Sequence, residues 1–175
     1  MVTGIRREIS KVKLTIYRAK GYLASPKRGV YYLADEYLDK NKVANKLYYP
    51  SYISLDTAMS KYGIIPETVY AITSVTTKAT REFSDDNYSY LFNKIKKNAY
   101  TGYKLDGDVL IADPEKALVD YLYFVSMGQR VFNDRLDLTK IDTKKVLEYA
   151  KLFNSKRLDR IIYEHVNWTT ITDYN

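Results

Sequence analysis

The stretch Tyr49-Pro50-Ser51-Tyr52-Ile53-Ser54-Leu55-Asp56-Thr57-Ala58-Met59-Ser60-Lys61-Tyr62-Gly63-Ile64-Ile65-Pro66 marks both ends of a short buried helix. Ser54 is a suitable N-cap, because its hydroxyl can accept a hydrogen bond from an amide of the first turn. An apolar face at helical spacing follows, made of Leu55, Ala58, Met59 and Tyr62. Gly63 can take the left-handed conformation that closes a helix, and Pro66 blocks continuation. We therefore predict a helix between Ser54 and Gly63.

The composition is that of a folded domain without cysteine. The chain has 175 residues, 46% of them hydrophobic, which is enough to build a core. No apolar run is long enough to span a bilayer, and Met1–Glu8 lacks the apolar segment of a signal peptide. Zero cysteines exclude disulfides, a thiolate nucleophile and a cysteine zinc site. We expect a cytoplasmic protein with no membrane partner.

The charge is concentrated at the N-terminus. The net charge is +7, and residues 1–33 hold eight basic side chains and one acid, which accounts for the whole excess. The remaining residues carry twenty basic and twenty acidic groups. A basic segment on a neutral body indicates a polyanion partner, with nucleic acid as the first candidate. The alternative is a solvated face that only keeps the protein soluble.

The basic segment has the pattern of a helix followed by a hairpin. One apolar stripe follows the 4-3-4-3 step of a helix, with Ile5, Ile9, Val12, Ile16 and Ala19. Another face carries Arg7, Lys11, Thr15 and Arg18. Gly21 ends the helix, and two β-prone runs, 22–24 and 30–33, flank the turn Ser25–Gly29.

A helix followed by a basic-tipped hairpin is the second half of a winged helix-turn-helix. In that motif the helix enters the major groove and the hairpin tip contacts phosphate. The residues before Ile5 are too few for the first helices, so we expect a partial module. A second subunit could complete its core, and a homodimer is one arrangement that the sequence allows. The alternative is that Ile5–Ala19 packs on the body or on another subunit without binding DNA.

The rest of the chain has the pattern of a mixed α+β domain. We expect a helix over 39–47, with Val43, Ala44 and Leu47 buried, and a covered central strand over 69–75. A second strand contains Tyr88, Tyr90 and Phe92, and a hairpin is predicted with Asp106-Gly107 as its turn. Asp113 should cap a helix that starts at Pro114, and Asp142 and Ser155 should cap two C-terminal helices. The predicted division is an arm, residues 1–38, and a body, residues 39–175.

Several side chains were weighed as catalytic groups. The only histidine, His165, lies on an apolar helical stripe, so we interpret it as a core or interface residue. A metal-dependent nuclease would need converging carboxylates. The candidates are Asp106, Asp108, Asp113, Glu115 with Lys116, and Asp142 with Lys144. Each has a sufficient turn or capping role, so we expect no enzyme activity, no metal and no cofactor.

The 19 tyrosines have two interpretations. Tyr88, Tyr90 and Phe92 could stack on bases, although aromatic residues are also common in sheet cores, which we favour. Others would suit a protein interface, where tyrosine is enriched. These are Tyr48, Tyr49, Tyr100 and Tyr103.

Three segments together resemble the AbiEi family, the antitoxins of bacterial abortive-infection (type IV) toxin–antitoxin systems. They are Pro50–Glu67, Ala71–Lys78 with Arg81-Glu82-Phe83, and Ile111–Asp120. The resemblance covers roughly residues 20 to 125. Its motif positions, with a structural or partner-binding role, are Pro50, Ser51, Tyr52, Ser54, Gly63, Pro66, Asp113, Pro114, Glu115 and Lys116.

The resemblance implies an antitoxin with two activities. The body would counteract a nucleotidyltransferase-like toxin, and the N-terminal module would bind operator DNA and repress its own promoter. The implied helix and wing contacts to DNA are Arg6, Arg7, Lys11, Lys13, Arg18, Lys20, Lys27 and Arg28. Two alternatives remain: an antitoxin body that binds only protein, or a divergent metal-dependent nuclease.

Overall fold

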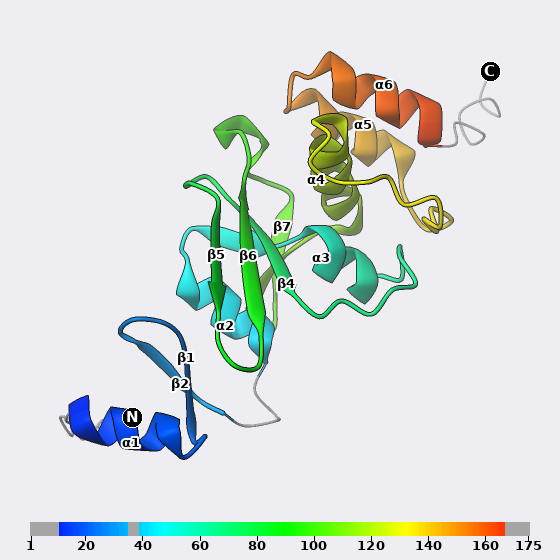
Figure 1. Cartoon of the computed structure of the whole chain (residues 1–175). Coiled ribbons are helices and arrows are strands. Elements are labelled where there is room, and N and C mark those ends of the chain that lie inside the picture. Colours follow the sequence, from blue (N-terminus) through cyan, green and yellow to red (C-terminus); the bar gives the residue numbers. More distant parts are fainter. Residues whose placement is uncertain (1–10, 35–38, 167–175) are drawn as a thin grey trace, which may run out of the picture.

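The protein has an α+β fold in which a small N-terminal arm extends from a larger body (Figure 1). The computed structural model describes residues 11–34 and 39–166. The arm consists of α1 (Lys11–Ala19) and the antiparallel hairpin β1 (Leu23–Lys27) and β2 (Val30–Leu33). Residues 5–10 of the predicted first helix lie outside the described residues.

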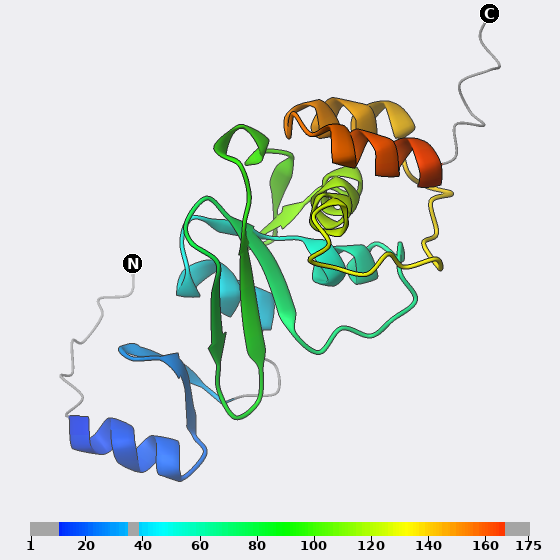
Figure 2. The same cartoon turned by 45° about the horizontal axis from the view of Figure 1, so that its top comes forward.

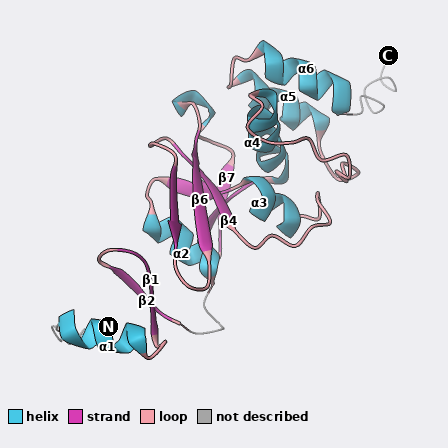
Figure 3. Ribbon diagram, in the orientation of Figure 1, coloured by secondary structure: helices cyan, strands magenta, loops and turns pink. Residues whose placement is uncertain are grey.

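The body is built on a six-stranded mixed sheet in the order β5-β6-β4-β3-β8-β7 (Figure 3). The strands are β3 (Ser51–Ile53), β4 (Ile72–Thr76), β5 (Arg81–Ser84), β6 (Ser89–Lys94), β7 (Tyr103–Asp106) and β8 (Val109–Ala112). β4 pairs parallel with β6, and β3 pairs parallel with β8, whereas the outer strands β5 and β7 pair antiparallel. The predicted central strand is confirmed, although it begins at Ile72.

Five α-helices cover the sheet. They are α2 (Lys40–Leu47), α3 (Leu55–Lys61), α4 (Pro114–Ser126), α5 (Thr143–Lys151) and α6 (Lys156–His165), with a 3-10 turn η1 at Lys97–Ala99. α4 packs against α3 on one side and against α5 and α6 on another (Figures 1 and 2). Ten consecutive residues of α4, Glu115–Phe124, are buried, as expected for a helix surrounded by other elements.

The stretch from Tyr49 to Pro66 forms β3 and α3, as predicted. The three strand residues and Leu55, Ala58 and Met59 are buried. Gly63 has φ +71°, and the amide of Ile64 donates to the carbonyl of Met59 at 2.9 Å, which closes α3 with a Schellman motif. Ser54 occupies the N-cap position but makes no capping bond, because its hydroxyl is used elsewhere.

Two hairpin turns are displaced from their predicted positions. The strands of the arm extend into the predicted turn, which leaves Arg28 and Gly29 as its two residues. In the β7–β8 hairpin, Asp106 pairs with Val109, so the turn residues are Gly107 and Asp108. Gly107 has φ +60°, and placing it first in the turn supplies the required left-handed residue.

The C-terminal helices confirm their predicted caps and correct the role of the histidine. Asp142 accepts from the amide of Lys144 at 2.9 Å, and Ser155 accepts from the amide of Leu158 at 3.4 Å. His165 is exposed, and its ring stacks on Phe132 with centroids 4.1 Å apart. It is therefore a surface residue, since the last turn of α6 lies at the edge of the packed layer.

Candidate nucleic-acid interface

The described arm, residues 11–34, carries six basic side chains and no acid. Helix α1 has no buried residue. Lys11 and Arg18 are seven positions apart and therefore share one side of the helix, and Lys13 and Lys20 share another. All four are exposed.

The hairpin adds the basic residues of the predicted wing. Lys27 ends β1 and Arg28 opens the turn, and both are exposed. The ammonium of Lys27 lies 5.4 Å from the ring centroid of Phe83, on β5 of the body. The structure therefore brings six of the eight predicted DNA contacts onto one small unit, whereas Arg6 and Arg7 lie outside the described residues.

The hairpin is fixed to the body by the side chain of Tyr32. Its hydroxyl donates to a carboxylate oxygen of Asp85 at 2.5 Å and lies 3.3 Å from the hydroxyl of Tyr90. Burial and these bonds raise the pKa of Tyr32 well above its ordinary value. This contact holds the wing at the β5–β6 end of the sheet (Figure 2).

The body has a buried polar centre that joins two of the segments behind the family resemblance. One oxygen of Asp120 on α4 accepts from the hydroxyls of Ser54 at 2.8 Å and Tyr52 at 3.1 Å. The other oxygen pairs with the ammonium of Lys116, one turn earlier on the same helix. All four side chains are fully buried.

The polar centre is electrostatically self-contained. Burial lowers the pKa of Lys116, and the charge of Asp120 opposes this shift. Burial raises the pKa of Asp120, while its three donors oppose the rise. The Lys116 ammonium also lies 5.0 Å from the ring centroid of Phe153 and 5.7 Å from that of Tyr52. Because none of these groups reaches solvent, the centre holds elements together and cannot contact a substrate.

The other motif residues also have structural roles. The carbonyl of Pro50 accepts from the hydroxyl of Thr76 at 2.6 Å, and Glu115 accepts from the amide of Asp142 at 3.2 Å. Asp113 precedes Pro114 at the start of α4 but makes no capping bond. Its carboxylate accepts from the hydroxyl of Tyr149 at 3.1 Å, which corrects its predicted cap role. Pro66 is exposed, and Ser51 is buried within β3.

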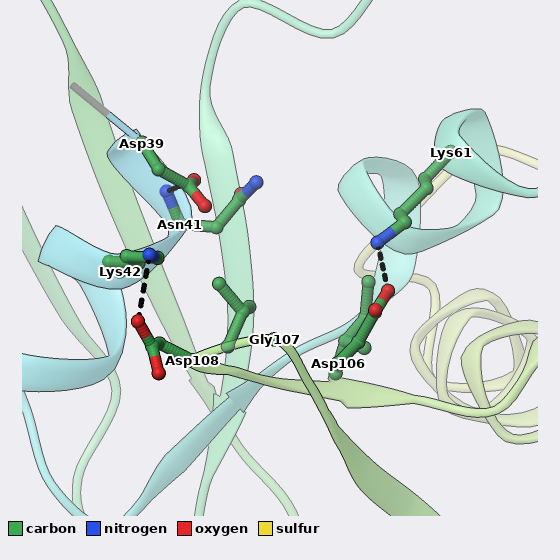
Figure 4. Close-up of a pocket in the computed structure, with 9 residues that line it drawn as sticks. Asp39, Asn41, Lys42, Lys61, Asp106, Gly107 and Asp108 are labelled. Carbon is green, nitrogen blue, oxygen red and sulfur yellow. Dashed lines mark hydrogen bonds and ion pairs between the residues drawn. The ribbon is translucent and has the colours of Figure 1, made fainter. Parts of the chain in front are cut away.

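The acids of the nuclease alternative point apart. Figure 4 shows Asp108 turned to Lys42 of α2 and Asp106 turned to Lys61 of α3, at 2.9 and 2.5 Å, on opposite sides of a pocket of about 370 Å³. The lysine partner lowers the pKa of each carboxyl group. Asp142 caps α5. Within residues 11–34 and 39–166, no three His, Cys, Asp or Glu side chains cluster closely enough to hold a metal ion.

The tyrosines divide between core and surface. Tyr90 and Phe92 are buried, as favoured from the sequence, and Tyr88 is half-buried. Tyr48 packs edge-on against Phe92 at 5.3 Å, so it belongs to the core and corrects the interface interpretation.

Tyr100 and Tyr103 cover the polar centre. Their rings lie 5.1 and 4.6 Å from that of Tyr52. Tyr103 is 37% exposed, and Tyr49 is 71% exposed. Of the four tyrosines assigned to an interface, these two therefore present an accessible surface.

Sequence reasoning did not identify Asp120 as the acceptor at the polar centre. The available signal was the Lys116–Asp120 pair at i, i+4 inside an apolar helix. A charged pair at that spacing usually lies on a solvated face, so the spacing alone does not show that it is buried.

No protein-family model and no curated protein matches this sequence. None of the helices that the structure describes has the length and apolar character needed to cross a membrane.

Proposed function

We propose that this protein is a cytoplasmic antitoxin of the AbiEi type, whose arm binds operator DNA and whose body counteracts a nucleotidyltransferase-like toxin. The observation that carries the DNA-binding part is the arm itself. A helix and a hairpin turn project from a neutral body with six basic side chains and no acid. Neutralised phosphates supply most of the affinity in such a contact.

The body supports the antitoxin part of the proposal. Tyr52 and Ser54 come from one segment of the resemblance and Lys116 and Asp120 from another, and all four meet in the polar centre. The second segment, Ala71–Lys78, supplies β4, which pairs with β3. The three segments therefore describe one packed unit, as expected if they are the core of a common fold.

Binding to the DNA upstream of the gene, titrated over salt concentration, tests the arm. Neutralising about four to six phosphates should give a slope of log affinity against log salt near −0.9 per phosphate. Lys11→Glu/Arg18→Glu should abolish binding. Lys144→Glu/Lys145→Glu makes the same charge change at exposed positions of α5 and should leave binding intact.

The outcomes separate the two activities. Equal affinity of the two double variants would refute DNA binding by the arm. A steep slope without preference over random DNA would reduce the arm to a nonspecific polyanion binder. Co-expression of the full chain with the toxin encoded beside it tests the body, and Lys11→Glu/Arg18→Glu should still restore growth. Loss of rescue in the wild type would refute the antitoxin part alone.

A further inference from the structure

The apolar stripe of α1 is uncovered in the described structure. Val12 is 68% exposed and Ile16 is 44% exposed. Leu14 is the half-buried residue of the helix, and at 100° per residue it lies on the side opposite to the stripe. The hairpin strand β1, against which α1 packs, therefore leaves the stripe facing away from the rest of the chain (Figures 1 and 2).

A nine-residue helix without buried residues is not stable alone. Burying its apolar stripe would supply the missing stabilisation, so the stripe requires an occupant.

The spacing of the stripe identifies a helix as its occupant. Val12, Ile16 and Ala19 follow the d-a-d steps of a heptad, and in the sequence Ile5 and Ile9 continue it as d and a. The a positions are thus both isoleucine. β-branched residues at a favour two-stranded parallel coiled coils.

The charges beside the stripe favour a second copy of the same chain in parallel orientation. The heptad places Lys13 and Lys20 at e, and Glu8 and Thr15 at g. A parallel pair sets g against the e position of the next heptad, which opposes Glu8 to Lys13 of the other copy. An antiparallel pair would set the e lysines against each other, which is repulsive.

We propose that the protein dimerises through α1, which pairs in parallel with α1 of a second copy through Val12, Ile16 and Ala19. The dimer joins two basic arms and leaves Lys11 and Arg18, at the c positions, outside the seam. The pairing goes beyond the proposed function and stands whether or not the arm binds DNA.

Disulfide cross-linking of the full chain tests the pairing and its orientation. The natural chain has no cysteine, so single-cysteine variants report on one position each. Ile16→Cys at an a position should form a covalent dimer under mild oxidation, because a residues face each other across a parallel seam. Arg18→Cys at a c position is the matched control and should stay largely monomeric.

Sedimentation velocity over a range of protein concentrations, without DNA, gives an independent readout. Ile16→Glu should weaken the dimer at least about tenfold, whereas Val131→Glu, at a residue of the body that is 89% exposed, should not. Lys13→Glu should also weaken it by opposing Glu8, and Glu8→Lys/Lys13→Glu should restore it.

A wild-type protein that sediments as a monomer at every concentration would overturn the proposal. Equal cross-linking of Ile16→Cys and Arg18→Cys, or failure of the charge swap to restore the dimer, would overturn the parallel seam. DNA is absent from all these measurements, so their failure is distinguishable from a failure of DNA binding.

Discussion

At the scale of single residues, Asp120 gathers more polar contacts in the core than any sequence pattern indicates. Two hydroxyls and one ammonium converge on its carboxylate, and all four side chains are buried. A buried charge without its partner is strongly unfavourable, whereas the satisfied pair is tolerated. Asp120 therefore links β3, the start of α3 and α4 through bonds that solvent cannot replace.

We expect Lys116→Met to destabilise the protein by about 3–5 kcal/mol, because it leaves the Asp120 carboxylate buried without a counter-charge. Chemical denaturation measures the free energy of unfolding. Lys145→Met, at an exposed position of α5, is the control and should cost less than about 0.5 kcal/mol. Lys116→Met/Asp120→Asn should cost less than the sum of the single changes. Additive effects would contradict the pairing.

Gly102 is required by a close approach. It has φ +72°, and a Cβ built there would lie 2.6 Å from a ring carbon of Tyr149 and 3.0 Å from Cγ of Lys116. Gly107, with φ +60°, has no atom within 4 Å of such a Cβ. The two glycines thus share a left-handed backbone, and Gly102 alone has a steric constraint.

Gly102→Ala should therefore destabilise the protein more than Gly107→Ala. The left-handed conformation costs alanine about 1–2 kcal/mol at either site, and overpacking against Tyr149 adds about 1–3 kcal/mol at Gly102. The comparison is made by urea denaturation of both variants. Equal losses would show that the ring of Tyr149 moves aside without cost.

At the scale of elements, the contact between the hairpin and the body decides where the arm points. The hydroxyl of Tyr32 reaches Asp85 and Tyr90, which belong to the β5–β6 end of the sheet. The Lys27 ammonium adds a contact to the ring of Phe83. The orientation of the basic turn thus depends on a few side chains.

Tyr32→Phe should loosen the hairpin without unfolding the body. Losing these hydrogen bonds should cost about 0.5–1.5 kcal/mol, measured as faster hydrogen exchange of the β1–β2 amides. The amides of β4 should be unchanged. Tyr31→Phe, at the neighbouring exposed position, is the control. Equal exchange in both variants would mean that the Tyr32 hydroxyl does not hold the hairpin.

At the scale of the whole molecule, much of the core is closed by tyrosine. Burial raises the pKa of seven tyrosines above their ordinary value of 10.0, and Tyr149 reaches about 12. The seven are Tyr32, Tyr52, Tyr62, Tyr90, Tyr100, Tyr121 and Tyr149. The folded protein retains these protons at a pH where the unfolded chain releases them.

The free energy of unfolding should therefore be unaffected by these groups below pH 10 and fall as the pH rises from 10 through about 12. Denaturant titrations at a series of pH values, followed by tyrosinate absorbance, measure this. Tyr149→Phe should flatten the slope, whereas Tyr70→Phe, at a residue 85% exposed, should not. A wild-type stability independent of pH over this range would contradict the buried hydroxyls.

The sequence by itself determined the α+β class, most element positions and the basic arm, because these depend on local periodicity, capping and charge. The helix ending at Gly63 and the Asp142 and Ser155 caps were all predictable within a few residues of each other. The tertiary structure decided the rest. Which acids pair with lysines, that Lys116 and Asp120 are buried, and that His165 is exposed all depend on contacts between distant segments. Local sequence carries no record of those contacts, since the same spacing suits a solvated helix face and a buried one.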